Sequence, residues 1–394
     1  MAETVWLLIS AALVLFMVPG LALFYGGMVR RKNILNMLMM NIYCLGIVPL
    51  VWVLVAYSLA SVGDGSLIGN LDAIGLKDVP DEALAGITFT MTFAVITPAL
   101  ISGGVADRLK FRAWAIFVPF WLLLVYSPVV FWVYSGWIHA LPAHDFAGGT
   151  AIHVNAGVAT LALVAVLGNR RGFPGATGRP HNLVLTMLGA GILWFGWFGF
   201  NAGGASDPAQ AAQAFMSTFL AGAAGMIAWL AIEARVDGKP TSLGAASGLV
   251  AGLVAITPAV TFVGTLASIL FGLLAGIACF YGTRLKVRVG FDDSLDVVGV
   301  HLVGGIVGGV LIGFLADANA GPDSDFLEGL LFGGGTELLF NQVVSIVVVM
   351  AYSFAVTYAL SKVLDLTVGL RVDSEEESEG LDVSEHGEIG YVFT

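Results

Sequence analysis

The sequence is poor in charged residues and in cysteine. Charged residues make up 11% of its 394 positions, whereas a typical soluble domain has about 25%. Both cysteines, Cys44 and Cys279, fall within apolar runs. We interpret them as small buried side chains, and we expect no disulfide framework, metal site or cofactor. A soluble protein of this length would not need so much apolar surface.

Two other features are missing. The first four residues lack the basic segment and small-residue cleavage site of a signal peptide, so the apolar run from Val5 is predicted to be a first spanning helix. A basic surface for nucleic acid is absent too. The net charge is −11, and eight acids lie between Asp373 and Glu388.

Long apolar runs are abundant. The chain is 58% hydrophobic and contains 51 glycines, which suit close helix packing in lipid. Its runs of roughly 20 residues match a hydrocarbon core of about 30 Å. We predict an all-α integral membrane protein with eleven helices, at 5–29, 34–62, 84–106, 113–138, 146–168, 182–204, 211–234, 242–260, 262–282, 295–316 and 334–362. Ten helices, with one long hairpin around 260–261, is the alternative.

The basic residues support eleven spans. With that count, 16 of the 17 lysines and arginines fall on one side, and only Lys77 falls on the other. The positive-inside rule makes the first side cytoplasmic. The predicted topology therefore places the N-terminus outside and the C-terminus inside a multi-pass cell (inner) membrane protein.

The sequence also suggests an internal repeat. Ile-Thr-Pro-Ala occurs at 96–99 in the third predicted helix and again at 256–259 in the eighth. Tyr25-Gly26-Gly27 and Asn201-Ala202-Gly203-Gly204 likewise end the first and sixth helices. An offset of five helices, an odd number, predicts two inverted five-helix repeats plus one extra helix.

Two histidines lie inside predicted spans. His153 and His301 each follow their helix start by about seven residues, or ~10 Å, which places both near the middle of the membrane. They lie on the fifth and tenth helices, which the repeat makes equivalent. Because ionisable groups at this depth usually face a cavity or one another, we interpret the pair as part of a substrate pathway. A structural hydrogen bond between core histidines is the competing interpretation, and a metal site lacks further ligands.

Aspartates and aromatic residues surround these helices. Asp145 and Asp296 precede the histidines at predicted helix starts, where a carboxylate caps free backbone amides. The run 194–201 alternates bulky aromatic residues with glycine. Tight helix packing explains such a run, and so does an aromatic vestibule that attracts a small cation.

With these motifs the sequence resembles the ammonium transporter family (Amt/Mep/Rh), closest to its bacterial and archaeal Amt members, over nearly its whole length. The resemblance lies in segments 18–27, 145–153, 194–203, 292–301, 366–371 and 379–388. It implies a homotrimer with one pore per subunit, a transporter and not an enzyme, and a role in ammonium uptake.

The resemblance also implies roles for individual residues. The twin pore histidines correspond to His153 and His301, and the stacked phenylalanine gate to Phe93 and Phe200. Trp197 and Ala147 are assigned to the outer vestibule, and Asp145 to its mouth. Two vestibule positions depart from the family pattern: Tyr134 stands where a tryptophan is usual, and Gly204 where a serine is usual.

The predicted mechanism recruits ammonium at the vestibule, deprotonates it and conducts ammonia past the histidines. An ammonium sensor with little flux is the alternative, because the outer site is altered. A channel for another neutral gas and an intramembrane enzyme are weaker alternatives. We divide the chain into a transmembrane domain, 1–363, and a cytoplasmic tail, 364–394, which the resemblance makes a regulatory segment that binds a PII-type signalling protein.

Overall fold

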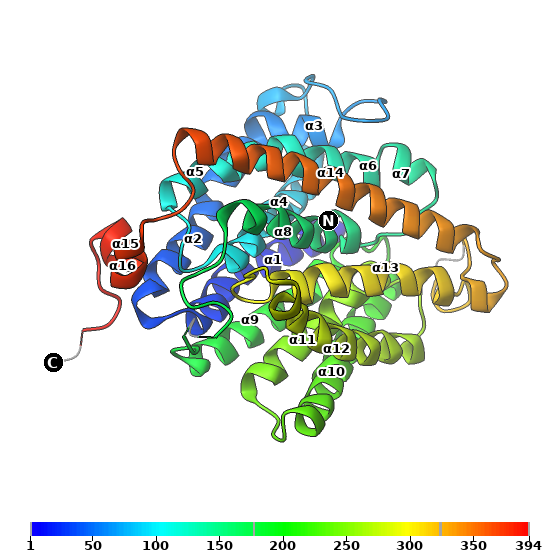
Figure 1. Cartoon of the computed structure of the whole chain (residues 1–394). Coiled ribbons are helices and arrows are strands. Elements are labelled where there is room, and N and C mark those ends of the chain that lie inside the picture. Colours follow the sequence, from blue (N-terminus) through cyan, green and yellow to red (C-terminus); the bar gives the residue numbers. More distant parts are fainter. Residues whose placement is uncertain (1, 176–177, 323–324, 393–394) are drawn as a thin grey trace.

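The computed structural model describes residues 2–175, 178–322 and 325–392, and these residues form helices joined by loops (Figure 1). The first half contains α1 (Ala2–Met28), α2 (Ile34–Val51), α3 (Tyr57–Ser61), α4 (Leu84–Val105), α5 (Phe111–Trp121), α6 (Ser127–Tyr134), α7 (Trp137–Ala140) and α8 (Asn155–Leu167). The second contains α9 (Leu183–Ala202), α10 (Pro208–Val236), α11 (Ser242–Ile256), α12 (Thr265–Val289), α13 (Val303–Leu315), α14 (Glu337–Thr367), α15 (Ser374–Glu379) and α16 (Leu381–His386).

Within the described ranges, ten helical segments are long and apolar enough to cross a membrane. The predicted eighth helix, 242–260, is shorter than expected because α11 ends at Ile256. Its 15 residues rise only about 23 Å. Buried turns that include Val260 and Val263 continue the segment. The protein is therefore a multi-pass membrane protein, and α11 is the one predicted span that length alone does not support.

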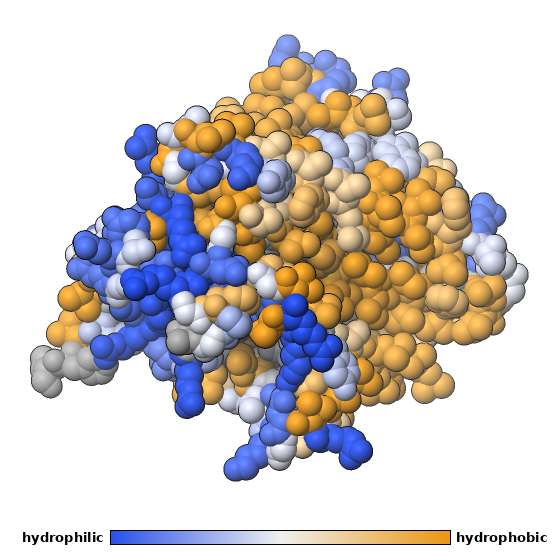
Figure 2. Space-filling model, viewed as in Figure 1, coloured by the Kyte–Doolittle hydropathy of each residue, from blue (hydrophilic) through white to orange (hydrophobic). Residues whose placement is uncertain are grey.

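The outer surface of the helix bundle is apolar. Large aliphatic and aromatic side chains are exposed along the peripheral helices, among them Leu8, Leu50, Phe215, Ile227 and Phe340. Figure 2 shows this apolar surface as a broad region, with hydrophilic residues gathered near the C-terminal helices. Such a continuous exposed apolar surface suits a lipid environment, where it is not a liability.

Helices α1 and α9, the first helices of the two predicted repeats, pack backbone against backbone. A Cβ added to Gly27 would lie 2.4 Å from the Asn182 carbonyl oxygen, and one added to Gly189 would lie 2.3 Å from the Phe24 nitrogen. Only glycine fits at these two positions, and small residues allow this close approach. Gly27, at the end of the Tyr25-Gly26-Gly27 motif, therefore serves the packing of α1 against α9.

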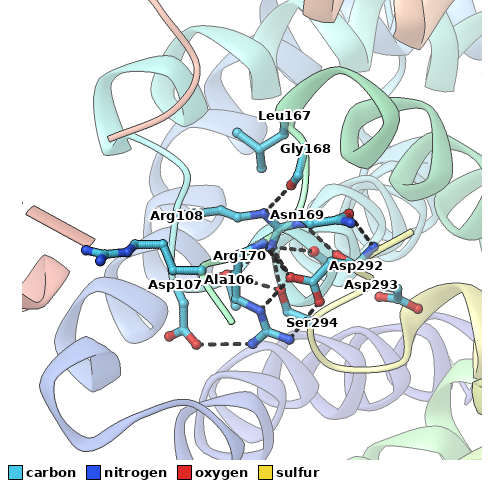
Figure 3. A network of polar contacts seen from close by, with 12 residues as sticks. Ala106, Asp107, Arg108, Leu167, Gly168, Asn169, Arg170, Asp292, Asp293 and Ser294 are labelled. Atoms are coloured by element: carbon cyan, nitrogen blue, oxygen red, sulfur yellow. Dashed lines mark hydrogen bonds and ion pairs between the residues drawn. The ribbon is translucent and has the colours of Figure 1, made fainter. Parts of the chain in front are cut away.

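Ion pairs connect the loops at one end of the bundle, which we call the basic face. It comprises the loops after α1, α4, α8 and α12, together with the C-terminal segment. Arg170 contacts Asp292 at 2.8 Å and Asp107 at 3.2 Å, and Arg108 lies 4.0 Å from Asp292 with no exposed side-chain surface (Figure 3). Burial lowers the pKa of Arg108 to about 10, so this arginine stays charged at neutral pH.

The C-terminal segment docks on the basic face. The Asn36 amide donates to the Asp382 carboxylate at 2.9 Å, and the Leu381 amide donates to the Asn33 side-chain oxygen at 2.9 Å. The Arg171 amide donates to Glu377 at 2.8 Å. Helices α15 and α16 thus contact the loops near α2 and α8, and in Figure 1 they lie together at one edge of the bundle.

Candidate functional site

The two buried histidines contact each other. Their Nδ1 atoms lie 3.3 Å apart, the ring centroids are 5.3 Å apart, and the side chains are nearly inaccessible. Because one nitrogen must donate and the other accept, this contact holds a single proton. His153 Nε2 is also buried and has no hydrogen-bond partner. That nitrogen is therefore available to a small molecule in the adjoining cavity.

Both histidines lie in π-helical turns, a detail that the sequence did not indicate. His153 belongs to Gly149–Val154, which leads into α8, and His301 belongs to Val298–Leu302, which leads into α13. The histidines therefore follow their helix starts by four and three residues, fewer than the predicted seven. π-Helical turns are rare in proteins, and those that occur often lie at functional sites. Their matching placement suits the repeat.

The caps of these two helices differ. The Asp145 carboxylate accepts hydrogen bonds from four consecutive backbone amides, those of residues 148–151. At the other helix the capping carboxylate is Asp293, which accepts from the amides of Val297 and Val298. The prediction that Asp296 caps this helix is wrong, because its carboxylate pairs with Lys286 at 2.6 Å.

A stack of aromatic rings covers the histidines on the side away from the basic face. The Phe93 and Phe200 centroids are 4.4 Å apart, and Phe200 stacks on His153 at 5.8 Å. Trp197 stacks on His153 at 5.4 Å and donates its Nε1 proton to Thr257 at 2.9 Å. The rings leave little room for water above His153.

A cavity of about 180 Å³, which we call the outer vestibule, lies outside this stack. Five of the six predicted vestibule and gate positions line it, namely Tyr134, Ala147, Gly204, Phe93 and Phe200. Trp197 does not line it. This side chain lines a smaller cavity beside His153 and His301, which we call the histidine cavity, contrary to its assignment to the vestibule.

Sequence reasoning missed several vestibule walls. Trp52, Phe89 and Tyr126 line the cavity. The Phe89 and Phe93 rings are 4.8 Å apart, and their spacing of four residues on one helix face was a usable signal. Trp52 and Tyr126 come from π-helical turns whose direction the sequence does not reveal.

Four cavities form a row through the bundle and share lining residues. The vestibule and the histidine cavity share Phe200. The histidine cavity and the next one share His301, and that cavity shares Asp296 with a fourth cavity of about 210 Å³ at the basic face. The two middle cavities are about 10 Å³ each, which is about the volume that one water probe occupies. The row is wide at both ends and narrow at the histidines.

The model of the Ammonium Transporter Family matches residues 5–391. The chain belongs to this family. Ammonium transporters from Mycobacterium tuberculosis (strain ATCC 25618 / H37Rv) and Bacillus subtilis (strain 168) are 48% and 45% identical to it, over 99% of this chain in each case and 90% and 98% of theirs. Ammonium transporter Amt1 of Archaeoglobus fulgidus is 41% identical over 98% of both chains.

Solved structures of the ammonium transporter family have the same fold. The crystal structure of Candida albicans Mep2 superposes with a TM-score of 0.88 at 30% identity, covering 95% of this chain and 87% of that one. A structure described as a Sensor Amt Protein superposes with a TM-score of 0.90 at 25% identity, covering 98% of both. The family to which the chain belongs consists of transport proteins rather than enzymes.

Proposed function

We propose that this protein conducts ammonium nitrogen across the membrane through the row of cavities described above. The observation that carries the proposal is the narrow apolar passage at His153 and His301, which lies between two wide cavities. A permanent charge in such a passage is strongly disfavoured. The passage suits neutral ammonia better than a hydrated cation, and potassium would be rejected because it has no proton to lose.

The vestibule recruits the cation in this mechanism. Tyr134, Phe93 and Phe200 present aromatic faces, which attract small cations. Ammonium transfers its proton to water in the outer vestibule, and the stacked pair Phe93 and Phe200 then excludes water, so that neutral ammonia enters. Ammonia continues inward and accepts or donates hydrogen bonds at the imidazoles, beginning with the unpartnered Nε2 of His153.

The topology belongs to the proposal as well. Eleven spans, with α11 and its buried turns as the eighth, place the basic face in the cytoplasm according to the positive-inside rule. The assembly is proposed to be a homotrimer in the cell membrane. The C-terminal segment 364–394 is proposed to be a regulatory tail that binds a PII-type signalling protein, and deleting the residues after Leu370 should abolish that binding.

The experiment compares uptake into proteoliposomes. His153→Ala and His301→Ala should each lose ammonium flux or its selectivity over potassium, and His139→Ala is the matched control because His139 is exposed on the short helix α7. Unchanged flux and selectivity in both pore variants would overturn the mechanism.

An ammonium sensor is the second candidate. The likeness to a Sensor Amt Protein and the departures at Tyr134 and Gly204 favour it. Methylammonium uptake, measured beside ammonium binding on the same preparation, separates the two functions. Binding without uptake identifies a sensor, and uptake at comparable concentrations identifies a transporter.

A further inference from the structure

The cavity at the basic face, which we call the inner vestibule, is strongly charged. Two acids, Asp107 and Asp296, contribute to its wall. Four basic side chains also line it, namely Arg30, Arg170, Arg179 and Lys286. The lining thus carries two more positive charges than negative ones, which is unexpected at the end of a pathway for a cation.

The two acids are already engaged. Asp107 lies 3.2 Å from Arg170 and 3.6 Å from Arg30, and it also accepts a hydrogen bond from Asn33. Asp296 is 2.6 Å from Lys286. Figure 3 shows Arg170 reaching both Asp107 and Asp292, so its guanidinium is satisfied within the protein.

Two arginines retain unused donors. Arg30 Nε lies 3.6 Å from the Asp107 carboxylate, too far for a hydrogen bond, and has no other hydrogen-bond partner, while Nη2 of the same side chain donates to the Glu377 carbonyl oxygen. Arg179 is exposed at the rim, and within the described residues its side chain has no recorded hydrogen bond or ion pair. A guanidinium presents its donors in a planar fork that fits oxyanions such as phosphate and carboxylate.

We propose that the inner vestibule binds a phosphate group, held by Arg30 and Arg179, from the side of the basic face. The cavity volume of about 210 Å³ is below the 300–1,000 Å³ of typical pockets for larger ligands, so it fits inorganic phosphate or a single headgroup and not a whole nucleotide. The two excess positive charges favour phosphate over a neutral solute.

Occupancy of this site closes the pathway. Met28, Leu295 and Asp296 line both the inner vestibule and the narrow cavity below His301, so an anion seated there lies across the exit. The anion also contacts Arg30, which holds the backbone of the C-terminal segment at Glu377. The site therefore connects the exit of the pathway to the docked tail.

The binding test uses isothermal titration calorimetry of the purified full-length protein in a non-ionic detergent. Inorganic phosphate is titrated at constant ionic strength, with chloride as the reference anion. Arg179→Gln removes one fork without breaking a recorded contact, and Arg235→Gln is the matched control because Arg235 is exposed on α10 and lies outside the cavity lining. We expect phosphate to bind the unmodified protein and Arg235→Gln equally, and to bind Arg179→Gln about tenfold more weakly.

Equal affinity of Arg179→Gln and the unmodified protein, or phosphate binding no tighter than chloride, rules out free inorganic phosphate as the ligand. A second arm repeats the comparison with vesicles of phosphatidic acid in zwitterionic lipid. Dependence on Arg179 in this arm alone identifies a lipid headgroup as the source of the phosphate, and dependence in neither arm overturns the proposal. Since binding is measured without transport, its failure is distinguishable from failure of the proposed function.

Discussion

The two ends of the row of cavities differ in the side chains that line them. The outer vestibule is walled by uncharged aromatic side chains such as Trp52, Tyr134 and Phe146. The inner vestibule is walled by arginines, a lysine and aspartates tied into ion pairs. An aromatic wall attracts a cation weakly without trapping it, whereas the charged wall holds loops together and repels the same cation. In the proposed mechanism the outer end therefore recruits the cation, whereas the inner end contributes stability through its ion pairs.

The largest loss of stability is expected when an ion pair at the inner end is broken. Asp292→Asn leaves Arg108 buried without its charged partner, and removing one member of a buried pair costs about 3–5 kcal/mol. We expect a clear loss of thermal stability in detergent, measured by the temperature at which the protein unfolds. Asp78→Asn is the control, because the pair of Asp78 with Lys77 is exposed. Equal effects of the two variants would contradict the contrast.

The same pair predicts an acid limit. Although burial raises the pKa of Asp292, its bonds to Arg170 and the charge of Arg108 hold the pKa below the ordinary value. A depressed carboxyl pKa contributes stability above the unfolded-state pKa and loses it as the pH falls through the folded-state value. Unfolding temperature should therefore drop in this acid range more steeply for the unmodified protein than for Asp292→Asn.

A smaller effect is expected at the outer end, where Asp145 is a helix cap. Asp145→Ala removes the acceptor of four amides and should cost at least the upper part of the usual capping range, about 2 kcal/mol. Asp207→Ala tests an ordinary cap in the same chain, because Asp207 caps α10 with two amides. If both variants unfold at the same temperature, Asp145 stabilises its helix no more than an ordinary cap does, and the prediction is contradicted.

Gly204→Ser should strengthen cation binding at the outer vestibule without disturbing the packing around it. An added Cβ would lie 3.9 Å from the nearest atoms, those of the Phe146 ring, so the side chain fits. Its hydroxyl offers a bound cation one acceptor, and a hydrogen bond to a charged group contributes about 1.5 kcal/mol. We expect roughly tenfold tighter ammonium binding, measured as the half-saturating concentration for uptake. Gly204→Ala is the control, since it adds bulk without an acceptor, and equal behaviour of both variants would contradict the prediction.

The smallest effect belongs to Tyr134→Trp. Tryptophan is the best cation–π partner, and the exchange should strengthen cation binding by at most about 0.5–1 kcal/mol, or two- to fivefold. The half-saturating concentration for uptake should fall by that factor, and Tyr57→Trp, outside the vestibule lining, should leave it unchanged. A rise would show that the narrower ring of Tyr134 is needed for access.

The sequence predicted the helices well because each spanning segment is a local apolar run. It also identified His153 and His301, since an isolated histidine in such a run is conspicuous. It failed where distant segments converge, because Arg108, Arg170 and Asp292 meet although they lie 62 to 184 positions apart in the chain. Capping by Asp293 and the inward turn of Trp197 depend on local backbone geometry, which no pattern of residue types encodes.

The contact between α1 and α9 has a mechanical consequence. Transporters that rock between inward-open and outward-open shapes need an interface along which their two halves can slide. At Gly27 and Gly189 the backbones are so close that even a methyl group has no space, and helices in such contact move as one piece. At these two positions the predicted repeats have no room to slide past each other, which suits the proposed selection of ammonium along a passage of constant width.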